Sequence, residues 1–328
     1  MNNKIKLHNT ALIGTGYWGS IIFNSLSKLT KKKIYIFDIN IQNSKLLKSK
    51  FKSKALIAKN FNEILKNKKI KNIILATHPS VNYKLGEKIL NNKKNLFVEK
   101  PILNDIRKLK KLIYLAKRNK KILMGGYIYL YNSYIKKIKQ IIESKELGII
   151  RYIEIQRKNL GPIRNEIGSH IDLGSHDISI LKYIFKDKLK LKNKIKRNIL
   201  RKNISDITTL NLSIGKINCE IISSWLNPTK ERKLLIVGTK KMLLFDEMEA
   251  KNKLKIFNKY AYYPKITKFK RNYISNKARI YKGKTKNIII RETDTLKNEL
   301  LHFELKSKNY KTPITNGKFC LDILKLVI

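Results

Sequence analysis

The chain has 328 residues, of which 42% are hydrophobic and 29% charged, and it carries a formal net charge of +50. This length suits two domains, because single cores stop growing at roughly 250–300 residues, and the apolar content excludes a wholly disordered chain. No run approaches the roughly 18 apolar residues of a membrane helix, and the first residues lack a secretory-signal pattern, so we expect a cytoplasmic protein without membrane contact. Two cysteines, Cys219 and Cys320, are too few for a disulfide framework or a zinc site.

The first 124 residues alternate short apolar strands with helices. We expect strands at Thr10–Ile13, Ile34–Phe37, Leu56–Ala58, Ile73–Ala76, Leu96–Val98 and Ile122–Met124. We expect helices at Tyr17–Leu29, Asn43–Phe51, Phe61–Lys66, Asn82–Asn91 and Asp105–Asn119. Strands that alternate with helices imply βαβ crossovers, so residues 1–124 are predicted to form an α/β domain with a doubly wound parallel sheet.

After Gly125 and Gly126 the pattern changes to a run of strands with turn-like links. We expect strands at Ile150–Gln156, Ile207–Ser213, Ile217–Trp225, Lys233–Val237, Met242–Phe245 and Leu254–Phe257. We expect a Gly/Pro loop at Asn159–Gly168 and helices at Ser133–Ser144, Ile171–Phe185, Thr295–Glu304 and Phe319–Ile328. The lysine-rich stretch Lys186–Lys202 is interpreted as a surface connection or an irregular strand. Residues 125–328 are therefore predicted to form an α+β domain with an antiparallel or mixed sheet.

A glycine-rich segment follows the first predicted strand and begins the first predicted helix. It reads Gly14-Thr15-Gly16-Tyr17-Trp18-Gly19 and fits the G-x-G-x-x-G pattern, in which glycines let the backbone approach a pyrophosphate at a helix N-terminus. Asp38 ends the second strand, where a carboxylate would bind the adenosine ribose and repel a 2′-phosphate. These features predict NAD, in preference to NADP, as the cofactor. The alternative is a glycine turn and a strand-end acid with no ligand.

The segment Glu99-Lys100-Pro101 follows the strand Leu96–Val98. Ligands bind at the carboxyl ends of strands in open α/β sheets, so Lys100 could donate a proton or anchor a substrate hydroxyl. The bond before Pro101 could be cis. The alternative interpretation of Lys100 is a surface lysine in a turn.

Asp172 and His176 lie four residues apart, and on a helix they would share a face. Oxidation of an alcohol needs a base for the hydroxyl proton, and an imidazole supported by a carboxylate suits that task. The alternative is a helix-capping aspartate with a core histidine. His170 is expected in a loop, and we expect no metal site, because no His/Cys cluster offers enough ligands.

Together these motifs resemble the Gfo/Idh/MocA family over essentially the whole chain. The opening Ala11–Gly19, the Glu99–Pro101 and Asp172–His176 segments, and Ala76-Thr77-His78-Pro79-Ser80, similar to the family's cofactor-covering loop, carry the resemblance. It implies an N-terminal Rossmann domain and a C-terminal α+β domain with an open, mostly antiparallel sheet. The face of that sheet often makes a dimer or tetramer interface, and the last helix can pack back on the first domain.

The resemblance also implies an activity, the NAD(P)-dependent oxidation or reduction of a carbinol on a sugar or cyclitol. Lys100 would anchor and polarise the reacting oxygen, His176 would be the acid/base, and Asp172 would support His176. Glu99 and Thr77 would line the nicotinamide side of the cofactor, and His78 and Pro79 would belong to the cofactor loop.

Finer similarity indicates bacterial members found with nucleotide-sugar genes. It covers Tyr129–Asn132, Gln156–Arg164, His176–Leu181 and Ser224–Pro228. Those members act, or are thought to act, as 3-dehydrogenases of UDP-N-acetylhexosamine-type sugars in surface-polysaccharide synthesis. Arg157, Asn159 and Arg164 are then expected to face the substrate, since arginine suits phosphate recognition. Asn82 and Tyr127 stand where many members have histidine, so both are expected near cofactor or substrate.

Three other functions are weighed against this one. The chain could oxidise a free sugar or cyclitol, or it could be a non-catalytic NAD-binding regulator, although the intact Lys100, Asp172 and His176 favour an enzyme. Binding to nucleic acid would fit the charge of +50. The lysines are spread along the chain together with Ile and Asn, which a base-composition bias explains, so we expect no specific nucleic-acid partner. A positive field would still attract a small polyanionic substrate.

Overall fold

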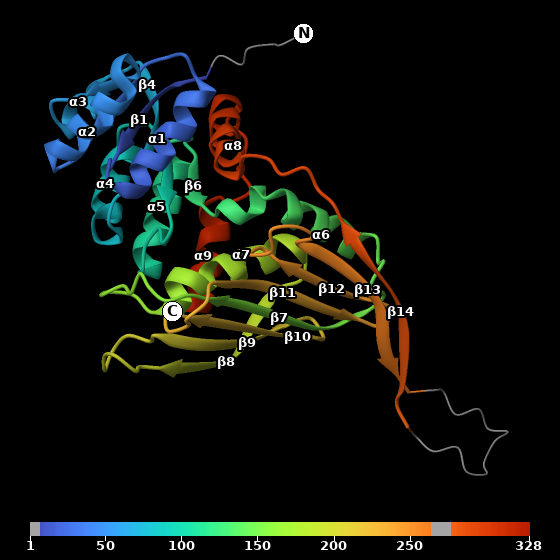
Figure 1. The fold of residues 1–328 in the computed structure, drawn as a ribbon. Coiled ribbons are helices and arrows are strands. Elements are labelled where there is room, and N and C mark those ends of the chain that lie inside the picture. Colours follow the sequence, from blue (N-terminus) through green and yellow to red (C-terminus); the bar gives the residue numbers. More distant parts are fainter. Residues whose placement is uncertain (1–6, 264–276) are drawn as a thin grey trace, which may run out of the picture. The chain divides into compact units, whose positions relative to one another are not determined.

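The computed structural model describes residues 7–263 and 277–328. The chain divides into two compact units, residues 1–131 with 293–326 and 328, and residues 132–292 with 327 (Figure 1). The first division falls after Tyr131 and not after residue 124, because the last strand of the first sheet and the turn after it belong to the first unit. The helical segment that follows Glu292 is also grouped with the first unit.

Within the described residues, the first unit contains a six-stranded parallel sheet in the order β3-β2-β1-β4-β5-β6. Its strands are β1 (Asn9–Ile13), β2 (Ile34–Phe37), β3 (Ala55–Ile57), β4 (Ile70–Leu75), β5 (Asn95–Glu99) and β6 (Leu123–Gly126). Its helices are α1 (Tyr17–Leu29), α2 (Ile41–Phe51), α3 (Phe61–Lys66), α4 (Pro79–Asn91), α5 (Ile106–Arg118), α8 (Thr295–Asn309) and α9 (Gly317–Val327), with the 3₁₀ turns η1 (Lys52–Lys54) and η2 (Ile128–Tyr131).

Each central strand of this sheet contains a buried apolar run. Leu12 of β1, Ile73 of β4 and Phe97 of β5 have no exposed surface. Buried apolar runs of this kind are typical of a parallel sheet that helices cover on both faces. Helix α4 begins three residues earlier than expected, because Pro79 occupies the first helical turn and the His78 ring accepts a hydrogen bond from the Ser80 amide.

The second unit, in residues 132–263 and 277–292, forms an eight-stranded sheet in the order β14-β13-β12-β11-β7-β10-β9-β8. Its strands are β7 (Ile150–Lys158), β8 (Leu189–Arg197), β9 (Ile207–Ile214), β10 (Ile217–Ser224), β11 (Glu231–Gly238), β12 (Met242–Asp246), β13 (Leu254–Tyr262) and β14 (Arg279–Ile288). Pairing is antiparallel except between β7 and β10. Helix α6 (Ser133–Glu143), a π-helix (His170–Gly174) and α7 (Ser175–Ile184) lie along one face of the sheet (Figure 1).

These two sheets confirm the predicted fold class, a parallel-sheet Rossmann domain followed by an α+β domain. The lysine-rich stretch does form a strand, β8, and the sheet extends one strand further than expected, to β14. Among residues 7–263 and 277–328, no helix combines the length and the apolar character needed to cross a bilayer.

Candidate active site

The glycine loop between β1 and α1 has geometry that only glycine fits at two positions. Gly14 has a φ of +89°, and a Cβ there would lie 2.4 Å from the carbonyl oxygen of Ala76. A Cβ at Gly19 would lie 2.0 Å from the carbonyl oxygen of Gly14. A Cβ at Gly16 would meet nothing within 4 Å. The first and third glycines are therefore needed for packing, whereas the second faces open space at the N-terminus of α1, where backbone amides suit a phosphate.

Asp38 links the end of β2 to this loop. Its Oδ2 accepts hydrogen bonds from the backbone amide of Thr15 at 2.7 Å and from the Thr15 hydroxyl at 3.3 Å. Its Oδ1 accepts from the Asn40 amide at 2.9 Å. The structure thus brings Asp38 and the glycine loop together. Tyr17 next to the loop is 84% exposed, so its ring stands open to a ligand.

Asn82, a buried residue of helix α4, holds the segment that follows β4. The Thr77 hydroxyl donates to Asn82 Oδ1 at 2.7 Å, and Asn82 Nδ2 donates to the carbonyl oxygen of Ile102 at 3.0 Å. Asn82 therefore ties the expected cofactor loop to the segment after Pro101. This is an internal structural role, and nothing in the sequence around Asn82 indicates it.

The Glu99-Lys100-Pro101 segment leaves the carboxyl end of β5 with a cis bond before Pro101. Glu99 Oε2 accepts a hydrogen bond from the Lys100 amide at 3.2 Å. Burial raises the pKa of the Glu99 carboxyl above its usual value, and a hydrogen bond from the Trp18 side chain and the charge of Lys100 oppose that rise. The loop residue Trp18 and the Glu99 side chain, both expected at the cofactor, are thus in contact.

Tyr127 is almost completely buried, at 5% exposure, just after β6. Its ring lies 5.8 Å from that of Phe319 in an edge-on arrangement. Burial raises the pKa of its hydroxyl well above the usual value, so the phenol stays neutral. Tyr127 packs inside the first unit.

In the second unit, Asp172 lies in the π-helix and His176 in the first turn of α7. π-Helical turns are rare and occur frequently at functional sites. Asp172 is buried, and its Oδ2 lies 3.6 Å from Nε of Arg164, which comes from the Gly/Pro loop. The structure thus brings two of the expected site residues, Asp172 and Arg164, together.

His170 was expected in a loop, but this prediction is wrong, because His170 begins the π-helix and is buried. Its Nδ1 lies 3.0 Å from the Ser205 hydroxyl and 3.3 Å from the Thr208 hydroxyl. Burial lowers the pKa of the imidazole to about 3. His170 is therefore a neutral residue that attaches the π-helix to the segment around Ser205.

Arg157, expected to face the substrate, lies on the buried face of β7. Its Nε and a terminal nitrogen donate to Asp177 Oδ1 at 2.8 and 2.7 Å, and the two side chains are 5% and 0% exposed. Asp177 is on α7, so this pair fastens the helix to the sheet. Asn159, in the adjoining loop, is held by hydrogen bonds with Gly161 and Arg232.

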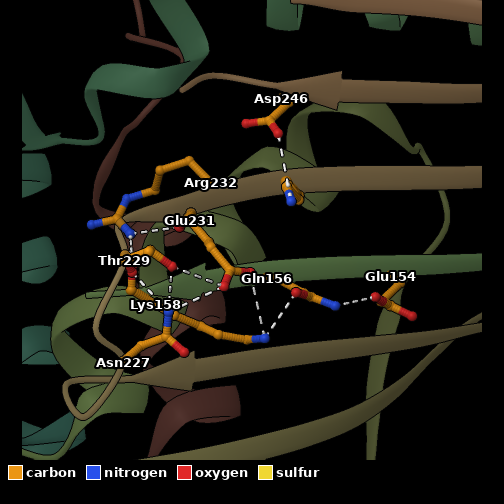
Figure 2. A network of polar contacts seen from close by, with 9 residues as sticks. Glu154, Gln156, Lys158, Asn227, Thr229, Glu231, Arg232 and Asp246 are labelled. Carbon is orange, nitrogen blue, oxygen red and sulfur yellow. Dashed lines mark hydrogen bonds and ion pairs between the residues drawn. The ribbon is translucent and has the colours of Figure 1, made fainter. Parts of the chain in front are cut away.

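The opposite face of β7 carries a polar network that the sequence reasoning missed (Figure 2). Gln156 donates to Glu154, and Lys158 donates to Gln156 at 2.8 Å and lies 3.6 Å from Glu231. The alternation of polar and apolar residues along β7 was the available signal. Glu231 also accepts hydrogen bonds from Asn227, Thr229 and Arg232, and a separate ion pair joins Asp246 to Lys233 (Figure 2).

The parallel sheet, the glycine loop after β1 and Asp38 at the end of β2 define an NAD-binding Rossmann fold. The sequence model described as "Oxidoreductase family, NAD-binding Rossmann fold" matches residues 8–127, and the "GFO/IDH/MocA C-terminal domain" model matches residues 135–244. The chain therefore belongs to the Gfo/Idh/MocA oxidoreductase family, which confirms the resemblance and the predicted cofactor, NAD.

Curated relatives match part of the chain. The uncharacterized oxidoreductase YrbE of Bacillus subtilis is 24% identical over 182 residues, and the myo-inositol 2-dehydrogenase of Thermotoga maritima is 22% identical over 179 residues. Each match covers 53% of this chain and 53% of the relative. The chain thus spans about half the length of these curated relatives.

Solved structures match nearly the whole chain in fold. The UDP-N-acetylglucosamine 3-dehydrogenase GnnA from Acidithiobacillus ferrooxidans has a TM-score of 0.78 at 15% identity, with 98% of this chain and 96% of that chain covered. The aldose-aldose oxidoreductase from Caulobacter crescentus complexed with glycerol has a TM-score of 0.79 at 14% identity, with the same coverage of 98% and 96%. At these identities the likeness shows the fold.

Proposed function

We propose that this protein is an NAD-dependent dehydrogenase that oxidises a sugar hydroxyl to a ketone. One observation supports it most: four expected site segments follow the carboxyl ends of adjacent strands of one parallel sheet. They are the glycine loop after β1, Asp38 after β2, Thr77 after β4 and Lys100 after β5. Carboxyl ends of neighbouring parallel strands lie along one edge, which is where open α/β sheets bind ligands.

The residues of the chain have separate roles in the proposed reaction. NAD, when bound, accepts a hydride from the carbinol carbon. Lys100 anchors the reacting oxygen and favours its developing negative charge. His176 takes the hydroxyl proton as general base, and Asp172 stabilises the charged imidazole. The alcohol and NAD⁺ thus give a ketone, NADH and one proton.

The proposed substrate is a UDP-N-acetylhexosamine or its uronic acid, oxidised at C3. Arg164 and Asn159, from the Gly/Pro loop, are the proposed contacts, whereas the Arg157 guanidinium is held by Asp177 inside the unit. The net charge of +50 suits a substrate with a pyrophosphate. A structure of similar fold is a UDP-N-acetylglucosamine 3-dehydrogenase, which supports this choice.

The direct test is NADH absorbance when the purified protein is given NAD with UDP-N-acetylglucosamine, its uronic acid or free sugars. We expect turnover with the nucleotide sugars and its loss in Lys100→Ala, while Lys108→Ala, which removes an exposed lysine of α5, keeps it. Full turnover by Lys100→Ala would remove that residue from the mechanism. Tight NAD binding without oxidation of any compound would indicate a regulator instead.

A cyclitol is the second candidate substrate. The Thermotoga maritima relative is a myo-inositol 2-dehydrogenase, and a cyclitol offers the same secondary carbinol without a pyrophosphate. Turnover of myo-inositol, with none of the UDP sugars, would select this candidate.

We also propose that the chain forms a homodimer or homotetramer through the sheet face that bears the polar network of Figure 2. On this face, half-buried apolar side chains of β11 and β12, Leu235 and Leu244, stand beside that network. Light scattering on the wild type should give a multiple of the chain mass of 38.4 kDa. Leu235→Lys should lower that mass, and an unchanged mass would place the interface elsewhere.

A further inference from the structure

Helix α8 carries two buried carboxyl groups in contrasting surroundings. Glu304 is satisfied, because its oxygens accept hydrogen bonds from the Thr10 hydroxyl at 2.6 Å and from the His8 amide at 3.2 Å. Glu299 has no exposed surface, and neither of its oxygens has a hydrogen-bond partner among residues 7–263 and 277–328. A buried carboxylate without donors is strongly unfavourable, so a chain that keeps Glu299 needs it protonated or bound to something else.

The charged group that acts on Glu299 is Glu99. The pKa of Glu299 is raised well above its usual value, first by burial and then by the negative charge of Glu99. Helix α8 packs against α1, with Tyr17 and Lys28, and against η2, with Tyr129 and Tyr131. It also contacts the sheet through Thr10 of β1, Asn72 of β4 and Phe97 of β5. Burial and the charge of Glu99 are the two causes of the shift.

The surroundings of the two carboxyls decide which one keeps the proton. Glu99 receives the Lys100 amide at 3.2 Å and a hydrogen bond from Trp18, and it lies near the charge of Lys100. Its carboxyl lies close against Gly126, where a Cβ would come within 2.8 Å of its Oε2. Like charges in a buried pair disfavour double ionisation. With its pKa raised to about 7, Glu99 is the carboxyl that ionises first, so above that pH the negative charge lies on Glu99 while the proton stays on Glu299.

We propose that Glu299 is a positioning residue for the nicotinamide end of the cofactor site, where as a neutral acid it leaves one negative charge on Glu99 beside Lys100. This rests on the proposed function, in which Glu99 lines the nicotinamide side. A single negative charge keeps the Lys100 amide and Trp18 bonded to Glu99. A second charge would hold the positive ring of NAD⁺ more tightly than the neutral ring of NADH, and it would pull on Lys100.

The first arm of the test measures unfolding of the full chain without cofactor, from about pH 5 to about pH 9. The pKa of Glu299 is higher in the folded state than in the unfolded chain, where it is about 4.3. The stability that neutral Glu299 contributes is therefore complete below about pH 4.3, and it is lost as the pH rises through the pKa of the folded state. Glu299→Gln, a neutral isostere, should reduce this alkaline fall in the denaturant midpoint. A midpoint profile parallel to that of the wild type would overturn the assignment of the proton.

The second arm measures the affinities for NAD⁺ and NADH over the same pH range. In the wild type the preference for NAD⁺ should rise roughly tenfold once Glu299 ionises. In Glu299→Gln only the change that accompanies the ionisation of Glu99, whose pKa is raised to about 7, should remain, because the amide cannot ionise. Glu304→Gln is the matched control: the amide has one acceptor oxygen in place of two, so the Thr10 hydroxyl and the His8 amide can no longer both be satisfied and stability falls, but the pH-dependent preference is kept.

The two arms separate the possible failures. A Glu299→Gln variant with a flattened stability profile but an unchanged NAD⁺/NADH preference would overturn the positioning role. A wild type that binds neither form of the dinucleotide would overturn the proposed function and the positioning role with it, while the stability arm would still decide where the proton lies.

Discussion

The Asp38 carboxylate accepts a hydrogen bond from the Thr15 amide at 2.7 Å, so one acid connects the end of β2 to the glycine loop after β1. The same carboxylate bonds the Asn40 amide with its other oxygen. A charge-assisted bond to a backbone amide is stronger than a neutral one. Asp38 therefore fixes the loop conformation as well as supplying the negative charge at the proposed ribose site.

Replacement of Asp38 should affect cofactor binding by both routes. We expect Asp38→Ala to weaken NAD binding by roughly 10- to 100-fold, which corresponds to the loss of one charged hydrogen bond of about 1.5–3 kcal/mol. Asp38→Asn should also narrow the discrimination against NADP, since it removes the repulsion of a 2′-phosphate. Calorimetric titration with NAD and NADP measures both. Asp105→Ala, which removes the N-cap acid of α5, serves as control, and equal losses in the two variants would contradict the assignment.

The glycine loop predicts opposite outcomes for two single-methyl changes. Gly14→Ala would place a Cβ 2.4 Å from the Ala76 carbonyl at a φ of +89°, so we expect it to destabilise the protein. Strain of this kind costs about 1–3 kcal/mol. Gly16→Ala adds a Cβ that meets nothing within 4 Å, so it should keep wild-type stability but lose affinity for NAD, because the methyl occupies the approach of the pyrophosphate.

Denaturant unfolding and NAD titration on both variants separate the two effects. A Gly16→Ala variant that binds NAD as tightly as the wild type would show that no ligand approaches that glycine. A Gly14→Ala variant as stable as the wild type would show that the Ala76 carbonyl can move away.

The parallel domain could be predicted because its signals are local. Strand β4 ends in the apolar run Ile73-Ile74-Leu75, which by itself indicates a buried strand, and the glycine loop lies directly between a strand and a helix. Strand β14 (Arg279–Ile288) gave no such signal, because its side chains are mostly exposed and rich in lysine. The segment forms a strand because it pairs with β13. The sequence of the segment alone does not indicate that pairing.

The site residues show the same limit. Arg157 is a polar residue near a Gly/Pro loop, so the sequence favours a substrate contact. Its partner Asp177 lies twenty residues away on another element, and no local pattern links them. Glu299 resembles any acid on an amphipathic helix, and only the packing of α8 places it out of reach of water.

The Arg157–Asp177 pair predicts a large cost for removing one partner alone. Arg157→Met leaves the Asp177 carboxylate buried and without its guanidinium, so we expect a loss of about 3–5 kcal/mol in the free energy of unfolding. The double variant Arg157→Met/Asp177→Leu should lose much less, because no charge stays buried. Denaturant titrations of both variants measure this, and a double variant less stable than Arg157→Met would contradict the interpretation.

Acid should destabilise the second unit through His170. Burial lowers the pKa of its imidazole to about 3, whereas the unfolded chain has the ordinary value of about 6.5. The unfolded state therefore binds the proton first. The stability due to neutral His170 is complete above about pH 6.5 and falls by about 1.4 kcal/mol per pH unit as the pH drops toward the folded value.

His170→Asn should remove this part of the acid sensitivity, since an amide of similar polarity can still bond the Ser205 or Thr208 hydroxyl. His78→Asn is the matched control, because asparagine keeps the N-cap acceptor of α4 and the His78 ring is not buried. Unfolding free energies from about pH 7 to about pH 5 should fall less steeply in His170→Asn than in the wild type or the control. Equal slopes in all three proteins would mean that the folded protein accepts a proton at His170 as readily as the unfolded chain does.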